Sequence, residues 1–350
     1  MTGSPGDPTL DVDRRWALDA VESVSRTFAL TVDLLEEPVA SWVCTGYLLC
    51  RAADTIEDDP SIPPKARAEL LETYESALDP ETDVTIDEFL SEVELHRPEE
   101  LNDDWEALVR TDRTMRVFES FDPPVREAMR GLVREMSTGM ASFLRRHAEH
   151  GGLRIETVDE LEEYCWYVAG TVGELFTGLV WQFDERAADA DPDDAEAFAL
   201  LLQLVNIAKD VRVDYETEGN VYLPGEWLTE EGIDHSAVGD PEATEALTRV
   251  VRRVADHAES HAPGARRYLE TLPAGEGNVL ESMALPYLLA LGTLRELRGR
   301  AEESVTKRDT VKLARAEVEA LYARADDGLT HAELDRLAEI VRQRPYHESV

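Results

Sequence analysis

The chain has 350 residues, enough to bury a sizeable core, and its 74 acidic side chains against 35 basic ones give a net charge of −39. The acids are spread along the whole chain, which argues against a protein that binds nucleic acid or anionic lipid through a basic patch. An acidic surface with few lysines is typical of a salt-filled cytoplasm, where screening weakens the self-repulsion, so we expect a halophilic source.

The chain ends and the cysteines indicate a cytoplasmic protein. We expect residues 1–10 to be a disordered tail and residues 11–345 to form one catalytic domain. Residues 1–8 lack the apolar core of a signal peptide, and no stretch reaches the roughly 18 uninterrupted apolar residues that span a bilayer. The cysteines, Cys44, Cys50 and Cys165, have neither disulfide nor metal-site spacing, which fits a reducing compartment.

The first helices lead to an acidic motif. The apolar pattern predicts a helix over residues 10–35, bent near Ser25, and a second one from Pro38 onward. This second helix ends in the acidic stretch 54–59, and helical spacing places four of its polar side chains on one face. They are Tyr47, Arg51, Asp54 and Asp58. Carboxylates one turn apart repel each other, so we expect a cation such as Mg²⁺ between them; a solvated acidic helix end is the alternative.

The middle of the chain is also predicted to be helical. Helices are expected over residues 65–78, around 105–118, and from 123 to a break at 151–152. Thr157 and Glu160 have the spacing of a capping box ahead of a helix that bears Tyr164. That helix contains three glycines, each of which costs roughly 1 kcal/mol against Ala, so either close packing or room for a substrate chain should explain them. The glycines are Gly170, Gly173 and Gly178.

A second polar stripe follows on the next predicted helix. Four side chains share one face of an otherwise apolar segment, and they are Gln203, Asn206, Asp210 and Asp214. Buried polar groups need partners, so two facing helices of this kind form a cage for several Mg²⁺ ions and a diphosphate. Residues 216–220 are predicted to be a loop leading to Tyr222, and helices are expected over 240–260, 278–299, 307–325 and 330–343. No strand pattern competes over a useful length.

These motifs resemble the two aspartate-rich motifs of the squalene and phytoene synthases, which condense prenyl diphosphates head to head. The resemblance extends to residues 25–30, 164–173 and 221–224, in the family's order, from about residue 20 to about residue 300. It implies an all-α, single-domain isoprenoid-synthase helical bundle. In this fold a central cavity is expected, with the two acidic helices at its mouth.

The amino-acid sequence of the motifs resembles squalene synthases more than phytoene synthases. The resemblance then implies that two farnesyl diphosphates condense to presqualene diphosphate, and that a hydride from NADPH (or NADH) completes squalene. It implies Mg²⁺ ligands on both acidic helices, with Glu57 as a weaker one. The ligands would be Asp54, Glu57, Asp58, Asn206, Asp210 and Asp214.

The resemblance also assigns substrate contacts. Arg51 and Lys209 match diphosphate-contacting positions, although the family usually has Arg where Lys209 stands. Tyr164 matches a residue that steers the proton lost in the first half-reaction; simple packing is the alternative for a lone tyrosine. The remaining substrate-binding positions are Ser25, Arg26, Thr27, Tyr47, Gln203 and Tyr222.

Two other functions stay open at this point. A phytoene or dehydrosqualene synthase would share the metal site but would not use NADPH. A non-catalytic helical interaction protein is disfavoured by the complete acidic motifs. No G-x-G-x-x-G fingerprint indicates a nicotinamide site. We expect a small-molecule prenyl diphosphate as partner, no nucleic acid, no transmembrane anchor and at most a transient membrane contact for product release; the sequence predicts neither the substrate's chain length nor the oligomeric state.

Overall fold

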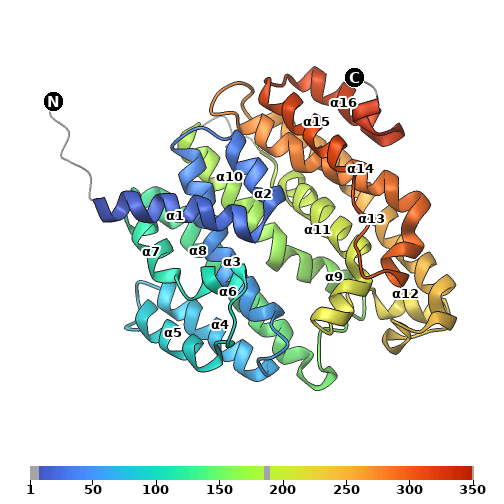
Figure 1. The fold of residues 1–350 in the computed structure, drawn as a ribbon, viewed down its shortest axis with the longest axis horizontal. Helices are drawn as coiled ribbons and strands as arrows, with labels where there is room; N and C mark the ends of the chain where they lie inside the picture. The colour runs from blue at the N-terminus through green and yellow to red at the C-terminus, as the bar shows by residue number, and fades with distance from the viewer. Residues whose placement is uncertain (1–7, 185–189, 349–350) are drawn as a thin grey trace.

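The computed structural model describes residues 8–184 and 190–348, and the regular elements among them are helices, with one isolated bridge between Arg154 and Val221. The predicted all-α fold is therefore confirmed (Figure 1). The helices are α1 (Pro8–Val24), α2 (Arg26–Leu34), α3 (Val39–Asp58), α4 (Pro64–Leu78), α5 (Ile86–Val93), α6 (Asp103–Leu108), α7 (Thr111–Glu119), α8 (Pro123–Arg146), α9 (Val158–Cys165), α10 (Thr171–Phe183), α11 (Pro192–Thr217), α12 (Gly225–Glu230), α13 (Thr244–Thr271), α14 (Val279–Thr306), α15 (Arg315–Asp326) and α16 (His331–Gln343).

Local capping chemistry accounts for several helix boundaries. Ser25 accepts a hydrogen bond from the backbone N–H of Phe28 and so separates α1 from α2, where the sequence predicts a bend. The Thr157 hydroxyl accepts from the backbone N–H of Glu160 at 3.1 Å, which is half of the expected capping box. The Glu160 carboxylate accepts instead from the backbone N–H of Glu156, so the reciprocal half does not form.

Several predicted boundaries were wrong. The helix expected over 307–325 begins only at Arg315, and the helices expected over 240–260 and 278–299 continue to Thr271 and Thr306. The helix expected around 105–118 is divided into α6 and α7, because the chain leaves helical geometry at Arg110. The long helix α8 ends at Arg146 rather than at the glycine pair 151–152. The loop expected at 216–220 begins later, because α11 continues through Thr217.

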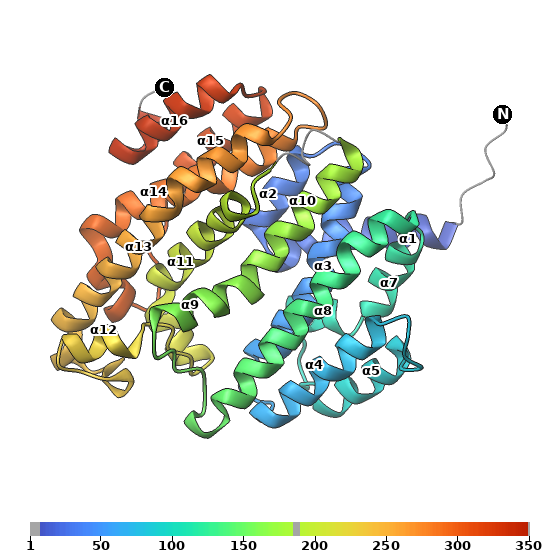
Figure 2. The same cartoon turned by 180° about the vertical axis from the view of Figure 1, so that it is seen from behind.

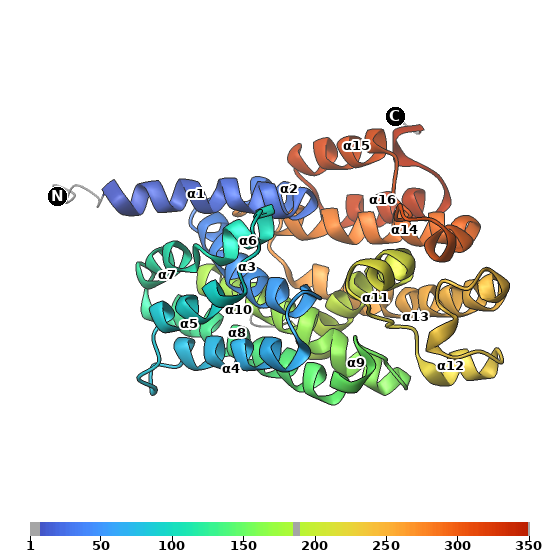
Figure 3. The ribbon, with the colours of Figure 1, turned by 60° about the horizontal axis from the view of Figure 1, so that its bottom comes forward.

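The bundle places α3 and α11 in its interior. Helix α11 packs against α13 and α14, and α3 packs against α8. Helix α10 contacts both α3 and α11, so it lies between the two acid-bearing helices (Figure 2). Figure 3 shows α1, α15 and α16 along one side of this interior and α4, α8 and α9 along the other. Within the described residues, no helix combines the length and apolar character needed to cross a bilayer.

Close helix contacts explain some of the glycines. A Cβ added at Gly139 of α8 would lie 2.1 Å from the Tyr167 ring, so only glycine allows this approach. At Gly173 an added Cβ would lie 3.4 Å from the Ala199 Cβ of α11, which is an ordinary van der Waals contact. Close packing is therefore a sufficient reason for a glycine at 139 but does not require one at 173.

A π-helical turn, Trp166–Gly170, joins α9 to α10 directly after Tyr164. Such turns insert one residue into an α-helix and are frequent at functional sites. The extra residue rotates α10 relative to α9. The face of α10 that contacts α3 therefore cannot be found by counting α-helical turns from Tyr164.

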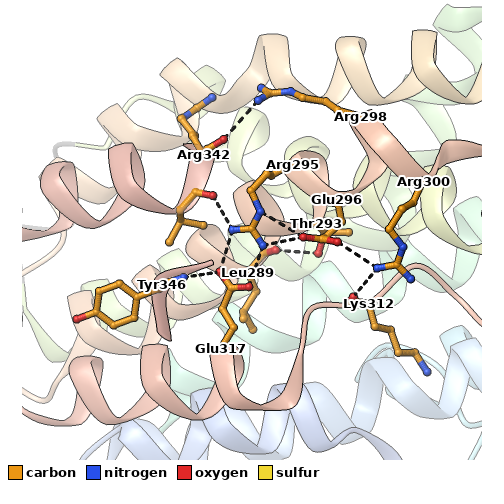
Figure 4. A network of polar contacts seen from close by, with 11 residues as sticks. Leu289, Thr293, Arg295, Glu296, Arg298, Arg300, Lys312, Glu317, Arg342 and Tyr346 are labelled. Carbon is orange, nitrogen blue, oxygen red and sulfur yellow. Dashed lines mark hydrogen bonds and ion pairs between the residues drawn. The ribbon is translucent and has the colours of Figure 1, made fainter. Parts of the chain in front are cut away.

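A buried ion pair holds the C-terminal helices on α14 (Figure 4). The Arg295 guanidinium of α14 donates to the Glu317 carboxylate of α15 at 2.8 Å and to the backbone carbonyl of Val341 in α16 at 2.8 Å. Glu317 is 1% exposed, and it also accepts from the backbone N–H of Tyr346 at 3.0 Å. Because each buried charge has several partners, the network connects three helices without an unpaired ion.

Candidate active site

The first acidic motif occupies the last turn of α3. Asp54 has a side chain that is 24% exposed, whereas Glu57 is only 2% exposed. Asp59 follows the helix, and its carboxylate accepts from the Trp105 indole N–H at 2.8 Å and from the backbone N–H of Ser61 at 2.8 Å. Asp59 is thus engaged in local structure, whereas Glu57 is buried and Asp54 and Asp58 are partly buried.

Two arginines lie beside these acids. The Arg51 guanidinium pairs with Asp104 at 2.9 Å and lies 3.8 Å from the Asp54 carboxylate. Arg67 of α4 is 2% exposed and donates to the backbone carbonyl of Glu57. Asp104 and Arg67 were missed by sequence reasoning because α6 and α4 meet α3 only through the fold.

The second acidic motif lies on α11 as predicted, but its stripe is not uniformly buried. The Asp210 side chain is 18% exposed and pairs with Lys209, and Asp214 lies one turn later, also partly buried. Asn206, one turn earlier, is exposed, and Gln203 is partly buried. No hydrogen bond within the described residues joins Asn206 or Gln203 to the carboxylates. The expectation of a buried stripe therefore holds for the second half of the motif and was wrong for Asn206.

Glu218 is an additional acid at the end of α11 that the sequence analysis missed. It caps the helix and accepts from the side-chain amide of Asn220 at 3.1 Å. Burial, together with the neighbouring charges of Asp58 and Asp214, raises the pKa of Glu218 to about 9. Its spacing of four residues from Asp214 was the available signal, and the predicted loop at 216–220 obscured it.

The charges of the two helices act on each other. Burial, opposed by Arg51 but assisted by Asp58, raises the pKa of Asp54 to about 7. Burial raises the pKa of Asp58 to about 6, and burial together with the neighbouring charges of Asp210 and Asp58 raises that of Asp214 to about 8. The fold therefore brings the α3 and α11 carboxylates together, as the two motifs predict.

This cluster has the character of a cation site. Within the described residues, its seven carboxylates share three basic side chains, Arg51, Arg67 and Lys209. The carboxylates are Asp54, Glu57, Asp58, Asp104, Asp210, Asp214 and Glu218. One oxygen of Glu57 and one of Asp210 are buried without a hydrogen-bond partner. Buried, unpaired carboxylate oxygens are costly, and hard divalent cations with oxygen ligands satisfy them.

A chain of two phenols, Tyr222 and Tyr164, reaches the cluster through Glu57. The Tyr164 hydroxyl donates to the Glu57 carboxylate at 3.3 Å and lies 3.1 Å from the Tyr222 hydroxyl. The Asn220 amide donates to the Tyr222 oxygen at 2.9 Å, and Asn220 is itself held by the backbone N–H of Leu153 at 2.8 Å. Burial and the neighbouring Glu57 carboxylate raise the pKa of Tyr164, so both phenols are neutral donors.

The segment around Ser25, which the family resemblance places near the substrate, divides into a part near the site and a part on the surface. Tyr47 stacks on Phe28 with ring centroids 3.9 Å apart, and its hydroxyl bonds with Ser25. Tyr47 lies one helical turn from Arg51, and Arg51 contacts the acids of the cluster. Ser25 is therefore linked to the cluster through Tyr47 and Arg51. Arg26 and Thr27 are exposed on the first turn of α2. The structure thus brings Ser25 and Tyr47 toward the acids, whereas Arg26 and Thr27 face away onto the surface and form no hydrogen bond or ion pair with the acids within the described residues.

Two surface hollows lie away from this cluster. One is lined by α4 and α5 residues that include Glu69, Thr73 and Glu88, and the other by α1 and α3 residues that include Arg15 and Trp42. Neither hollow is lined by a carboxylate of the cluster. The candidate site is therefore identified by the grouping of its carboxylates and by their shifted pKa values, and not by a surface hollow.

An all-α bundle in which two helices present facing carboxylates is the isoprenoid-synthase fold. A family model for squalene/phytoene synthase matches residues 21–317, and the chain belongs to the squalene/phytoene synthase family. Members of this family are prenyltransferases that generally use a divalent metal.

Relatives with known names are moderately similar. The chain is 27% identical to a squalene synthase of Eremothecium gossypii over 78% of its own length and 60% of that protein. It is 27% identical to a presqualene diphosphate synthase of Botryococcus braunii over 84% of its length and 69% of that protein. It is 26% identical to the human squalene synthase over 78% of its length and 61% of that protein. The chain thus spans about 60% of the length of the squalene synthases it matches.

Solved structures confirm the fold. The structure described as TcSQS in complex with the ligand BPH1237 is 24% identical, with a TM-score of 0.76 over 97% of this chain and 99% of that one. A dehydrosqualene synthase is 22% identical, with a TM-score of 0.60 over 97% of this chain and 98% of that one.

Proposed function

We propose that the chain is a squalene synthase, which condenses two farnesyl diphosphates to presqualene diphosphate and reduces that intermediate to squalene. The observation that carries the proposal is the charge coupling between Asp58 on α3 and Asp214 on α11 beside the buried Tyr164. The squalene synthases among the relatives at 26–27% identity support squalene as the product, and the presqualene diphosphate synthase at 27% identity supports the first condensation.

The carboxylates of both helices would hold Mg²⁺. Asp54 and Asp58 would do so from α3, and Asp210 and Asp214 from α11, with Asn206 at the exposed end. Bound Mg²⁺ would stabilise the charge that develops on the departing diphosphate. Glu57 would be the weaker ligand, because one of its oxygens already accepts from Tyr164.

Basic side chains near the acids would orient the diphosphates. Arg51 and Lys209 are the candidates, and each also pairs with an acid of the cluster. Lys209 supplies a point charge rather than the planar fork of an arginine, so its contact would be less directional. Ser25, Arg26, Thr27, Tyr47, Gln203 and Tyr222 would contact the remainder of the substrate.

The phenol chain offers a route for the proton of the first half-reaction. The carbon–oxygen bond of one farnesyl diphosphate breaks, the double bond of the second substrate attacks the resulting cation, and loss of a proton closes the cyclopropane ring. Tyr164 is held by Tyr222 and Glu57, so it would steer that proton. The Tyr164 oxygen would take up the substrate proton as its own hydroxyl proton passes to the Glu57 carboxylate.

A dehydrosqualene or phytoene synthase is the second candidate, because it needs the same acids for the same ionisations. The similarity to a dehydrosqualene synthase structure extends to the fold alone. The difference between the candidates is whether a nicotinamide reaches the final cation. NADPH use is therefore part of the proposal, supported by the squalene synthases among the relatives.

Product analysis tests the proposal. The full chain is incubated with farnesyl diphosphate and Mg²⁺, with and without NADPH, and the hydrocarbons are identified by mass spectrometry. A squalene synthase gives squalene with NADPH and rearranged, unreduced products without it. A conjugated triene indifferent to NADPH establishes the second candidate, and the absence of any pyrophosphate release leaves a non-catalytic protein. Asp210→Asn serves as the inactive control.

We also propose that the protein works in a salt-rich cytoplasm, because its net charge is −39. Thermal unfolding followed against KCl tests this. We expect the unfolding temperature to rise with KCl to molar concentrations; maximal stability in dilute buffer contradicts the proposal.

A further inference from the structure

Helix α13 presents two histidines one turn apart to a carboxylate of α9. The ligand atoms of His257, His261 and Glu162 all lie within 4.8 Å of one another. The His257 Nε2 atom is 2.9 Å from a Glu162 carboxylate oxygen, and the two imidazole centroids are 5.1 Å apart. Spacing of four residues places both rings on the same face of α13.

One nitrogen of this group is unsatisfied. The Nε2 atom of His261 is buried and has no hydrogen-bond partner. An orphaned buried nitrogen is costly, and its cost is removed if its lone pair binds a metal. Burial and the adjacent His257 lower the pKa of His261, so the ring is neutral near physiological pH, as a metal ligand must be.

The charge around Glu162 is also negative. Within the described part of the chain, no lysine or arginine forms an ion pair with Glu162, whose carboxylate meets His257 instead. Burial and the charges of Asp193 and Glu162 raise the pKa of Glu196 on α11, so a second carboxylate lies within electrostatic range. This surplus of negative charge favours a bound cation at the cluster.

We propose that Glu162, His257 and His261 form a binding site for a divalent transition-metal ion such as Zn²⁺, separate from the Mg²⁺ carboxylates. Two imidazoles and one carboxylate suit Zn²⁺, whereas Mg²⁺ prefers oxygen ligands only. Three protein ligands leave a coordination position for water. The site does not depend on the proposed prenyl-transfer function.

The metal would connect two parts of the bundle. Glu162 lies two residues before Tyr164 on α9, and both histidines lie on α13. A metal bound to all three side chains stabilises the folded chain, because the unfolded chain does not hold them together. We therefore expect Zn²⁺ to raise the unfolding temperature.

Calorimetric titration tests this site. Zn²⁺ is titrated into the full chain in the presence of excess Mg²⁺, which occupies oxygen-only sites on the acidic surface. We expect one Zn²⁺ per chain, with an affinity at least about tenfold lower in His257→Gln and in His261→Gln. His96→Gln, a histidine remote from the cluster, and Asp210→Asn should bind Zn²⁺ like the unmodified chain.

Thermal unfolding provides the second measurement. Zn²⁺ should raise the unfolding temperature of the unmodified chain and of Asp210→Asn, but not of His257→Gln, whose partly exposed ring can be replaced without opening the core. Circular dichroism verifies that each variant is folded. Equal Zn²⁺ affinity in the unmodified chain and in the His257→Gln variant, or loss of Zn²⁺ binding in Asp210→Asn alone, would overturn the proposal.

Discussion

The phenol oxygens of Tyr164 and Tyr222 lie 3.1 Å apart, with the rings stacked at 5.0 Å between centroids. The Tyr164 hydroxyl donates to Glu57, so the Tyr222 hydroxyl must donate to Tyr164, and the Asn220 amide donates to Tyr222. Each hydroxyl thus has a defined donor and acceptor role. This order fixes the Tyr164 oxygen beside the carboxylates of α3.

Removing the Tyr164 hydroxyl should slow the first half-reaction more than it weakens substrate binding. We expect Tyr164→Phe to lower kcat by about 10²-fold or more, within the range for a positioned proton-transfer group, with a smaller change in KM. Presqualene diphosphate formation measured without NADPH isolates this step. Tyr222→Phe leaves Tyr164 in place and should cost less; equal rates in Tyr164→Phe and the unmodified chain would remove the tyrosine from the mechanism.

Metal-free protein should lose stability as the pH rises. The pKa values of Asp54 and Asp58, about 7 and about 6, and that of Asp214, about 8, lie above the unfolded value of about 3.9. The folded state therefore binds more protons than the unfolded state between about pH 4 and pH 8, so its free energy of unfolding falls across this window. Bound Mg²⁺ compensates the ionised acids and should reverse the trend.

Thermal unfolding at about pH 6 and about pH 8.5, in chelator and in Mg²⁺, measures this effect. We expect a lower unfolding temperature at the higher pH without metal, and a larger Mg²⁺-induced rise there. Asp214→Asn should flatten the pH dependence. A metal-free protein that is more stable at about pH 8.5 would contradict the arrangement of the carboxylates.

Glu218 should contribute to metal binding although it lies outside the recognised motif. Its carboxylate is coupled to Asp58 and Asp214, so Glu218→Gln should raise the Mg²⁺ concentration needed for half-maximal activity about tenfold. Glu216→Gln is the matched control, because Glu216 is exposed and pairs with Arg212 and Arg308. If the two variants require the same Mg²⁺ concentration, Glu218 has no part in the site.

The contact between Gly139 and Tyr167 should be sensitive to one methyl group. Gly139→Ala forces the Tyr167 ring or α8 to move, and overpacking of this kind costs about 1–3 kcal/mol in the free energy of unfolding. Gly131→Ala on the same helix meets nothing within 4 Å and should be neutral or stabilising by up to about 1 kcal/mol. Denaturant unfolding compares them; equal stability of the two variants would exclude the close contact.

The sequence predicts those parts of the site whose spacing is local. Helical spacing predicts that each aspartate pair shares one face of its helix; the pairs are Asp54 with Asp58 and Asp210 with Asp214. Tyr164 lies on a helix whose capped start the sequence also indicates. Arg67 and Asp104 reach α3 from other elements, so no local pattern indicates them. Asn206 is exposed because of which elements pack on that turn of α11. The hydrophobic periodicity of one helix does not give this information.

The central claim is that α3 and α11 act as one metal-binding unit that activates a prenyl diphosphate. A double-mutant cycle with Asp58→Asn and Asp210→Asn tests it through the rate of pyrophosphate release from farnesyl diphosphate at saturating Mg²⁺. Asp193→Asn, an exposed acid on the same helix as Asp210, controls for the loss of one charge.

Each single variant should fold and should lose at least about a hundredfold in kcat, about 2.7 kcal/mol of transition-state stabilisation. Because the two carboxylates would serve the same ions, the double variant should be little slower than either single one. Near-normal release in either single variant, or losses that multiply in the double variant, would contradict a shared site.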